Sequence, residues 1–146
     1  MQVRIAFGKV SSEGVAALRG VEAYVRRCGL ERSLLELVRM RASQINRCGY
    51  CLDMHSKDAR VAGESEQRLY VLPAWREAPF YTERERAALE WTEALTLVSQ
   101  EGVSDELYER VRQHFSEKEL VDLTLAITTI NTWNRLAIAF RSEVGS

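Results

Sequence analysis

The chain has 146 residues and a formal net charge of −1, and 46% of its residues are hydrophobic while 28% are charged. This length suits one ordinary domain, and the composition excludes a disordered chain. Because lysine and arginine do not gather in one stretch, no nucleic-acid partner is expected. The N-terminal residues lack the pattern of a secretion signal, and no apolar run approaches the roughly 20 residues of a membrane span. We therefore expect a cytoplasmic protein with no membrane partner.

The first part of the chain predicts an extended arm followed by three helices. Residues 1–11 alternate loosely between apolar and polar side chains, which indicates an extended segment. A helix should begin after Ser11 or Ser12 and end at Gly29, because apolar residues recur at helical spacing between them. The next expected segments are a helix over residues 31–44, a break over residues 46–49, and a helix that begins near Cys48 and ends before Gly63.

The rest of the chain predicts further helices, two of which are opened by capping boxes. In residues 82–85 and 116–119, a threonine or serine is followed three residues later by glutamate, which is typical of a helix N-terminus. The other expected segments are a short helical piece at 67–71, a loop through Pro73 and Pro79, a helix from 82 to near Gly102, one over 105–114 and a long one after 116. The predicted fold class is therefore all-α: a bundle of about six to seven helices with a short extended N-terminal arm, in a single domain over residues 1–146.

Two of the three cysteines, Cys48 and Cys51, are separated by only two residues. An odd, low cysteine count argues against a disulfide scaffold, so the pair indicates redox chemistry or metal binding. At 100° per residue, helical positions 48, 51 and 55 lie within about 60° of one another. Cys48, Cys51 and His55 are therefore expected on one helix face, where the two thiols could close a disulfide with little backbone movement.

A helix that begins at Cys48 would also favour the reactive form of the thiols. Unpaired N–H groups and the helix dipole stabilise a thiolate at a helix N-terminus. His55, one turn further on, could accept a thiol proton when neutral or hold a thiolate when charged. This arrangement suits attack on a peroxide oxygen, formation of a sulfenic acid and its condensation with the second thiol.

Glu36 interrupts an otherwise apolar stretch of the second helix, at residues 34–38. Burial disfavours the charged form of a carboxyl group, so we expect the pKa of Glu36 to be raised. A carboxyl group with a raised pKa could carry protons near neutral pH.

The spacing Glu36-x11-Cys48-x2-Cys51-x3-His55 resembles the motif of AhpD-like alkyl hydroperoxidases, within the wider carboxymuconolactone decarboxylase superfamily. The resemblance covers most of the chain after residue 12, with further similar segments at residues 67–70, 75–78 and 131–137. It implies an AhpD-like helical bundle whose catalytic unit is the helix pair over residues 31–63. It also implies a thiol-dependent peroxidase or dithiol–disulfide oxidoreductase that holds no cofactor and no metal.

The resemblance further implies a role for each motif residue. Cys51 would meet the peroxide, Cys48 would resolve the sulfenic acid, and Glu36 and His55 would relay protons. Some members carry a histidine just before the second cysteine, where this chain has Tyr50. Because a tyrosine with its usual pKa near ~10 does not shuttle protons at pH 7, we expect a shorter relay here.

The implied partners are a hydroperoxide substrate, a dithiol reductant such as a dihydrolipoyl protein, and further copies of the chain in a trimer or hexamer. A physical argument also favours a homo-oligomer, because the helix over residues 120–139 is apolar around much of its circumference and needs cover.

Three other interpretations stay open at this point. Cys48, Cys51 and His55 could bind zinc, with Glu36, Cys28 or water as the fourth ligand, in a non-catalytic metal-binding module. The chain could be a decarboxylase like the superfamily's namesake, although such enzymes do not depend on a Cys-x2-Cys pair. The two cysteines could also be ordinary buried residues.

Overall fold

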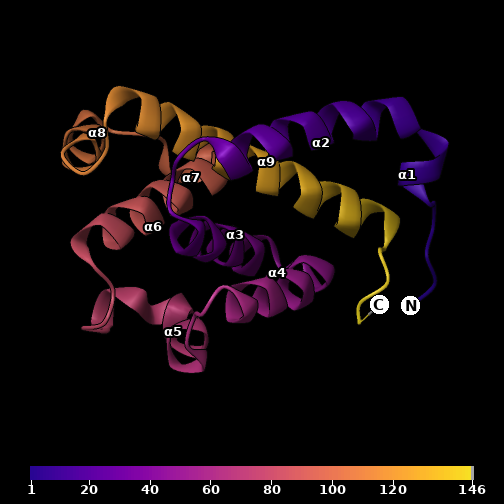
Figure 1. Cartoon of the computed structure of the whole chain (residues 1–146), viewed down its shortest axis with the longest axis horizontal. Helices are drawn as coiled ribbons and strands as arrows, with labels where there is room; N and C mark the ends of the chain where they lie inside the picture. The colour runs from indigo at the N-terminus through magenta and orange to yellow at the C-terminus, as the bar shows by residue number, and fades with distance from the viewer. Residues whose placement is uncertain (146) are drawn as a thin grey trace.

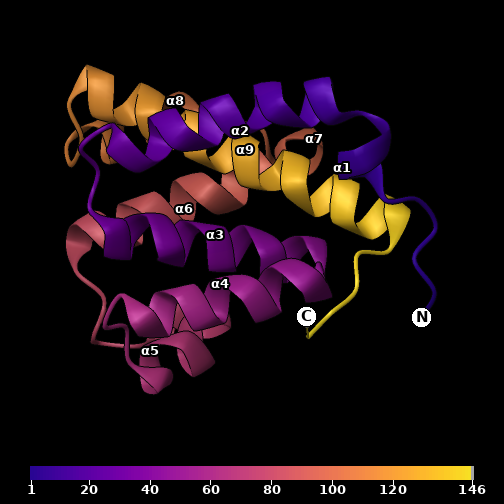
Figure 2. The same ribbon diagram turned by 45° about the vertical axis from the view of Figure 1, so that its right-hand side comes forward.

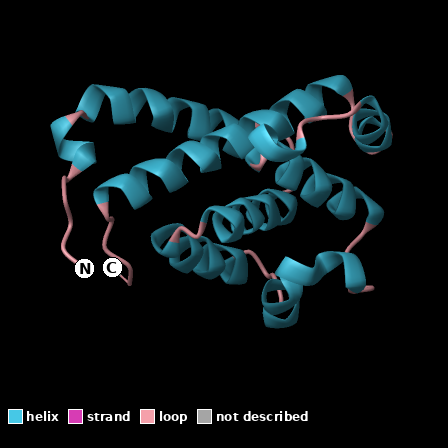
Figure 3. Cartoon of the chain, turned by 180° about the vertical axis from the view of Figure 1, so that it is seen from behind, coloured by secondary structure: helices cyan, strands magenta, loops and turns pink. Residues whose placement is uncertain are grey.

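Helices joined by short loops make up the computed structural model, which describes residues 1–145 and contains no strand within that range (Figures 1 and 3). The all-α prediction is therefore confirmed. The six longer helices are α2 (Ser12–Arg27), α3 (Arg32–Asn46), α4 (Gly49–Val61), α6 (Glu83–Thr96), α8 (Asp105–Arg112) and α9 (Glu117–Phe140). The shorter elements are α1 (Phe7–Val10), α5 (Glu66–Val71), the 3-10 helix η1 (Leu72–Glu77) and α7 (Val98–Glu101).

Helix α3 occupies the centre of the molecule, because it packs against α4, α6 and α9 (Figure 2). Nine of its residues are buried. On one side, a cluster of apolar residues joins α3 to α2, α6, α8 and α9, and its fully buried members include Val25, Val38 and Leu123. On the other side, a second cluster around Leu37 and Leu72 joins α3 to α4, α5 and η1. Both faces of α3 are thus fixed, and α3 in turn supports the start of α4.

The two predicted capping boxes are confirmed. Thr82 accepts the Glu85 N–H while the Glu85 carboxylate accepts the Thr82 N–H, and Ser116 and Glu119 do the same at the start of α9. These reciprocal bonds satisfy backbone donors that have no partner inside the helix.

The prediction of an extended arm over residues 1–11 is wrong for its second half. Residues 7–10 form the short helix α1, and only residues 1–6 and Ser11 lie outside a helix. The Arg4 N–H donates to the Phe140 carbonyl oxygen at 2.9 Å, and the ring of Phe7 contacts that of Phe140 at 5.8 Å between centroids. Contact with the end of α9, which the local alternation of residues could not reveal, therefore sets the conformation of this segment.

The loop expected through Pro73 and Pro79 also contains regular structure, since η1 begins at Leu72. The indole N–H of Trp75 donates to the buried Glu93 carboxylate at 3.0 Å, which holds η1 against α6. Among the described helices, none has the length and the apolarity that a membrane crossing needs.

Candidate active site

A tight break between α3 and α4 places Cys48. Helix α3 ends at Asn46, and Arg47 adopts a left-handed conformation with φ of 57°. The Cys48 N–H then donates to the Ser43 carbonyl oxygen at 3.0 Å, which satisfies an end group of α3. Cys48 becomes the N-cap of α4, as the sequence predicted when it placed a break over residues 46–49 and a helix after it.

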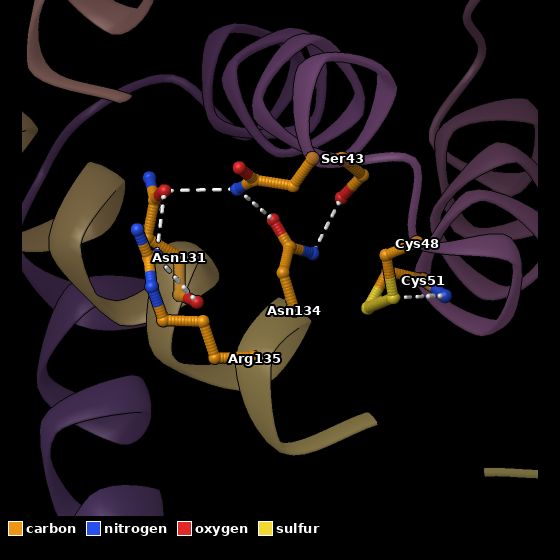
Figure 4. Close-up of a disulfide and its surroundings, with 7 residues drawn as sticks. Ser43, Cys48, Cys51, Asn131, Asn134 and Arg135 are labelled. Atoms are coloured by element: carbon orange, nitrogen blue, oxygen red, sulfur yellow. Dashed lines mark hydrogen bonds between the residues drawn. A yellow bond between two sulfur atoms is a disulfide. The ribbon is translucent and has the colours of Figure 1, made fainter. Parts of the chain in front are cut away.

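Cys48 and Cys51 form a disulfide across the first turn of α4, with their Cα atoms 5.3 Å apart (Figure 4). Each cysteine is only 1% exposed. The Sγ atom of Cys48 accepts a hydrogen bond from the Cys51 N–H at 3.3 Å, the position that a capping side chain takes at a helix N-terminus. After reduction, the same N–H group and the helix dipole would stabilise a thiolate on Cys48.

Cys51 and His55 line one cavity of about 460 Å³ between α2, α4 and α9. Helix α4 brings both side chains to this cavity because they lie one turn apart on the same face. Cys48 is not among the residues that line it. The other lining residues are Phe7, Arg19, Glu22, Ala23, Arg26, Tyr50, Met54, Trp133, Ala137 and Ser142.

Behind the cavity, His55 meets Glu36 across the interface of α4 and α3. The two residues are 4% and 5% exposed, and His55 Nδ1 lies 3.5 Å from Glu36 Oε2. The structure thus brings together Cys48, Cys51, His55 and Glu36, the four residues that the sequence singled out.

The pKa of Glu36 is lowered, so the expectation of a raised pKa is wrong. Burial alone raises the pKa of this carboxyl group. The facing imidazole of His55 and the positive charge of Arg39 lower the pKa by more than burial raises it. Arg39, one turn later on α3 and 4% exposed, donates from Nη1 to Glu36 Oε1 at 2.9 Å. Its Nη2 donates to Glu22 at 2.9 Å. Glu36 is therefore a paired carboxylate.

Residues 12–94 match the carboxymuconolactone decarboxylase family. This match spans more than half of the chain and includes the Glu36, Cys48, Cys51 and His55 positions. The chain is an AhpD-like member of the carboxymuconolactone decarboxylase family. The family resemblance read from the motif is confirmed.

Relatives of known sequence or structure resemble the chain along nearly its whole length. The uncharacterised protein YdfG of Bacillus subtilis is 44% identical over 146 residues, which is 100% of this chain and 99% of that protein. A crystal structure from Agrobacterium tumefaciens, of a protein of unknown function proposed to be the antioxidant defence protein AhpD, is 45% identical with a TM-score of 0.95 and covers 99% of both chains. An uncharacterised peroxidase-related protein from Silicibacter is 25% identical with a TM-score of 0.79, over 90% of this chain and 70% of that one.

A buried polar network holds the AhpD-like cysteine segment against α9 (Figure 4). Asn134, which is fully buried, donates to Ser43 Oγ at 3.0 Å and accepts from Asn46 at 2.9 Å. Asn46 also donates to Asn131 at 2.9 Å, and Arg135 donates to Asn131 as well. The last turn of α3, from which the chain leads into Cys48, is thus tied to α9 by side chains.

Replacing Asn134 with leucine should lower the free energy of unfolding by about 2 kcal/mol or more, because the buried Ser43 and the half-buried Asn46 each lose a partner. Urea denaturation of the oxidised protein measures this loss. Thr132→Leu, on an exposed position of the same helix, is the matched control and should change stability by less than about 0.5 kcal/mol. Equal stability of the two variants would contradict a structural role for the network.

The zinc site considered from the sequence would need free thiols on Cys48 and Cys51, which are joined in a disulfide in this structure. Within residues 1–145, the group whose ligand atoms could surround an ion is Glu36, His55 and Asp58, and it includes neither Cys48 nor Cys51. Cys28 is a free, half-buried thiol that packs against the main core cluster.

Sequence reasoning missed three features of the site. Arg39 could have been noticed as a charged residue one turn after Glu36 in a stretch that is otherwise largely apolar. Trp133, on the apolar helix α9, lines the same cavity as Cys51. No local signal marks Arg19, which reaches the cavity from α2 only through the tertiary packing of α2 on α9.

Proposed function

We propose that the protein is an alkyl hydroperoxidase-like peroxidase, a thiol-dependent oxidoreductase that reduces organic hydroperoxides through Cys51 and Cys48. The observation that carries this proposal is the position of Cys51. Cys51 is joined to Cys48 and lines the same cavity as His55. The imidazole of His55 in turn faces the Glu36 carboxylate.

In the first step, the Cys51 thiolate attacks the outer oxygen of a hydroperoxide R–OOH. The O–O bond breaks, an S–O bond forms, and the leaving alkoxide takes one proton, which gives R–OH and a sulfenic acid on Cys51. His55 lines the same cavity, so it can accept the thiol proton and return it to the alkoxide. The negatively charged Glu36 stabilises the imidazolium that exists between these two transfers.

In the second step, the Cys48 thiol condenses with the sulfenic acid, releasing water and forming the disulfide. A dithiol reductant then attacks Cys51 Sγ, which faces the cavity, and Cys48 leaves as a thiolate. The Cys51 N–H at the start of α4 stabilises this leaving thiolate. Intramolecular attack by the second reductant thiol releases Cys51, so the reductant becomes a disulfide and the enzyme regains two thiols.

The cavity walls favour an organic hydroperoxide over hydrogen peroxide. Phe7, Met54, Trp133 and Ala137 supply an apolar lining on which an alkyl or aromatic group can be buried. Such binding energy is not available to hydrogen peroxide. We further propose a dihydrolipoyl protein or a similar dithiol as reductant, assembly into a trimer or hexamer, and a cytoplasmic location.

A thiol titration tests the proposed chemistry. The reduced Cys28→Ser variant has two thiols per chain, and one equivalent of cumene hydroperoxide should remove both and yield one equivalent of the alcohol. Dihydrolipoamide should restore both thiols. Survival of the thiols in the presence of peroxide would refute the proposal, and decarboxylation by a Cys48→Ser/Cys51→Ser variant would instead support the activity of the superfamily's namesake.

A further inference from the structure

We propose that Glu36, His55 and Asp58 form a binding site for a divalent transition-metal ion of the zinc type, and that its occupation blocks the action of His55. His55 lines the same cavity as Cys51, whereas Glu36 and Asp58 do not line it. A small second cavity of about 230 Å³, lined by Glu36 and Asp58 among others, leads to the proposed site.

The ligand atoms already stand close to the distances that a tetrahedral ion requires. His55 Nδ1 lies 3.5 Å from Glu36 Oε2 and 3.9 Å from Asp58 Oδ2, and the three ligand atoms all lie within 4.8 Å of one another. Zinc bonds of about 2.0–2.2 Å to nitrogen and oxygen place neighbouring ligand atoms roughly 3.4 Å apart. Asp58 is the residue that must adjust, and its side chain is 45% exposed and therefore able to do so.

Two of the three ligand atoms are buried without a hydrogen-bond partner. His55 Nδ1 and Glu36 Oε2 face each other at 3.5 Å, but neither makes a hydrogen bond within the described residues. Both residues are more than nine-tenths buried, where a polar atom without a partner is unfavourable. An ion between them would give each atom a bond, and water or a fourth group could complete the coordination from the small cavity.

The surrounding charges select the kind of ion. Arg39 binds the other oxygen of Glu36, as outer partners of ligating carboxylates commonly do. Arg26 and Arg32, which also line the small cavity, oppose a cation that is held by charge alone. An imidazole ligand and two carboxylates therefore favour zinc, cobalt or nickel over calcium or magnesium, which bind oxygen ligands.

Binding is tested on the oxidised Cys28→Ser protein, in which the disulfide leaves no free thiol. Titration with Co²⁺, followed by its visible absorption, should give one ion per chain with the bands of nitrogen and oxygen ligands. Zn²⁺ should displace the cobalt. Asp58→Asn should weaken binding by about tenfold or more, while Asp53→Asn, a carboxylate on the same helix that pairs with Lys57, should leave it unchanged.

Lack of one-to-one binding, or equal affinity of the Asp58→Asn variant and the parent, would overturn the site. Because this titration involves no turnover, it does not depend on the proposed peroxidase activity. The blocking effect does rest on that activity: zinc should slow hydroperoxide reduction by the parent and by Asp53→Asn, but not by Asp58→Asn at the same zinc concentration. Binding without this difference would overturn the blocking effect alone.

Discussion

Replacing Cys51 with serine should lower kcat/KM for an organic hydroperoxide by about three orders of magnitude or more. A serine hydroxyl is not ionised at neutral pH and cannot form a disulfide, so both halves of the proposed cycle are lost. Cys51 is fully buried in the first turn of α4, and serine is nearly the same size, so the fold should persist. Steady-state assays with cumene hydroperoxide and dihydrolipoamide measure the loss, with circular dichroism as the check on folding.

Cys48→Ser is the matched variant, because it removes the partner thiol and keeps the thiol at the cavity. It should reduce one equivalent of hydroperoxide per chain in a single burst, leaving a sulfenic acid that dimedone traps on Cys51. Cys28→Ser should turn over like the parent, since Cys28 packs against the core cluster away from α4. If Cys51→Ser instead showed the burst and Cys48→Ser did not, the assigned order of the two thiols would be reversed.

Replacing Arg39 with methionine should lower the free energy of unfolding by about 3–5 kcal/mol at neutral pH. Arg39 and Glu36 are 4% and 5% exposed, so the substitution leaves a buried carboxylate without its cation. Methionine keeps most of the length of the side chain, which limits the loss of packing. Urea denaturation measures the change, and Arg26→Met is the control because Arg26 is exposed and contributes only a weak surface pair.

The double variant Glu36→Gln/Arg39→Met separates charge from packing. Glutamine removes the unpaired negative charge, so the double variant should be more stable than Arg39→Met alone, with a coupling of about 0.5–3 kcal/mol between the two sites. Strictly additive effects would contradict the interpretation that Arg39 compensates Glu36.

Local sequence signals predicted most of the helices. The capping boxes at Thr82 and Ser116 and the break before Cys48 depend on residues within a few positions of each other, and all three are found in the structure. The segment around Phe7 was wrongly predicted as extended. Its conformation depends on a contact with Phe140, which is distant in sequence. Local periodicity contains no information about such a contact.

In the candidate site, too, features set by neighbouring residues were predicted, and features set by tertiary contacts were not. Cys48, Cys51 and His55 lie within two turns of one helix, so spacing alone brought them together. The ionisation of Glu36 was mispredicted because its charge depends on which groups surround it in space. Arg39 turns its side chain inward to Glu36 and Glu22, and a sequence does not say whether an arginine on a helix points inward or to solvent.

The scarcity of buried residues on α4 has a dynamic consequence. Only Cys51, His55 and Ala59 are buried along this helix, whereas α3 buries nine residues. Helices with few buried contacts open locally at a smaller free-energy cost than global unfolding requires. The cysteines of the disulfide are each 1% exposed. We therefore expect the disulfide to become accessible when α4 opens locally while α3 stays folded. A reductant too large for the cavity would react only with that opened population, and its rate would then follow the local opening equilibrium of α4.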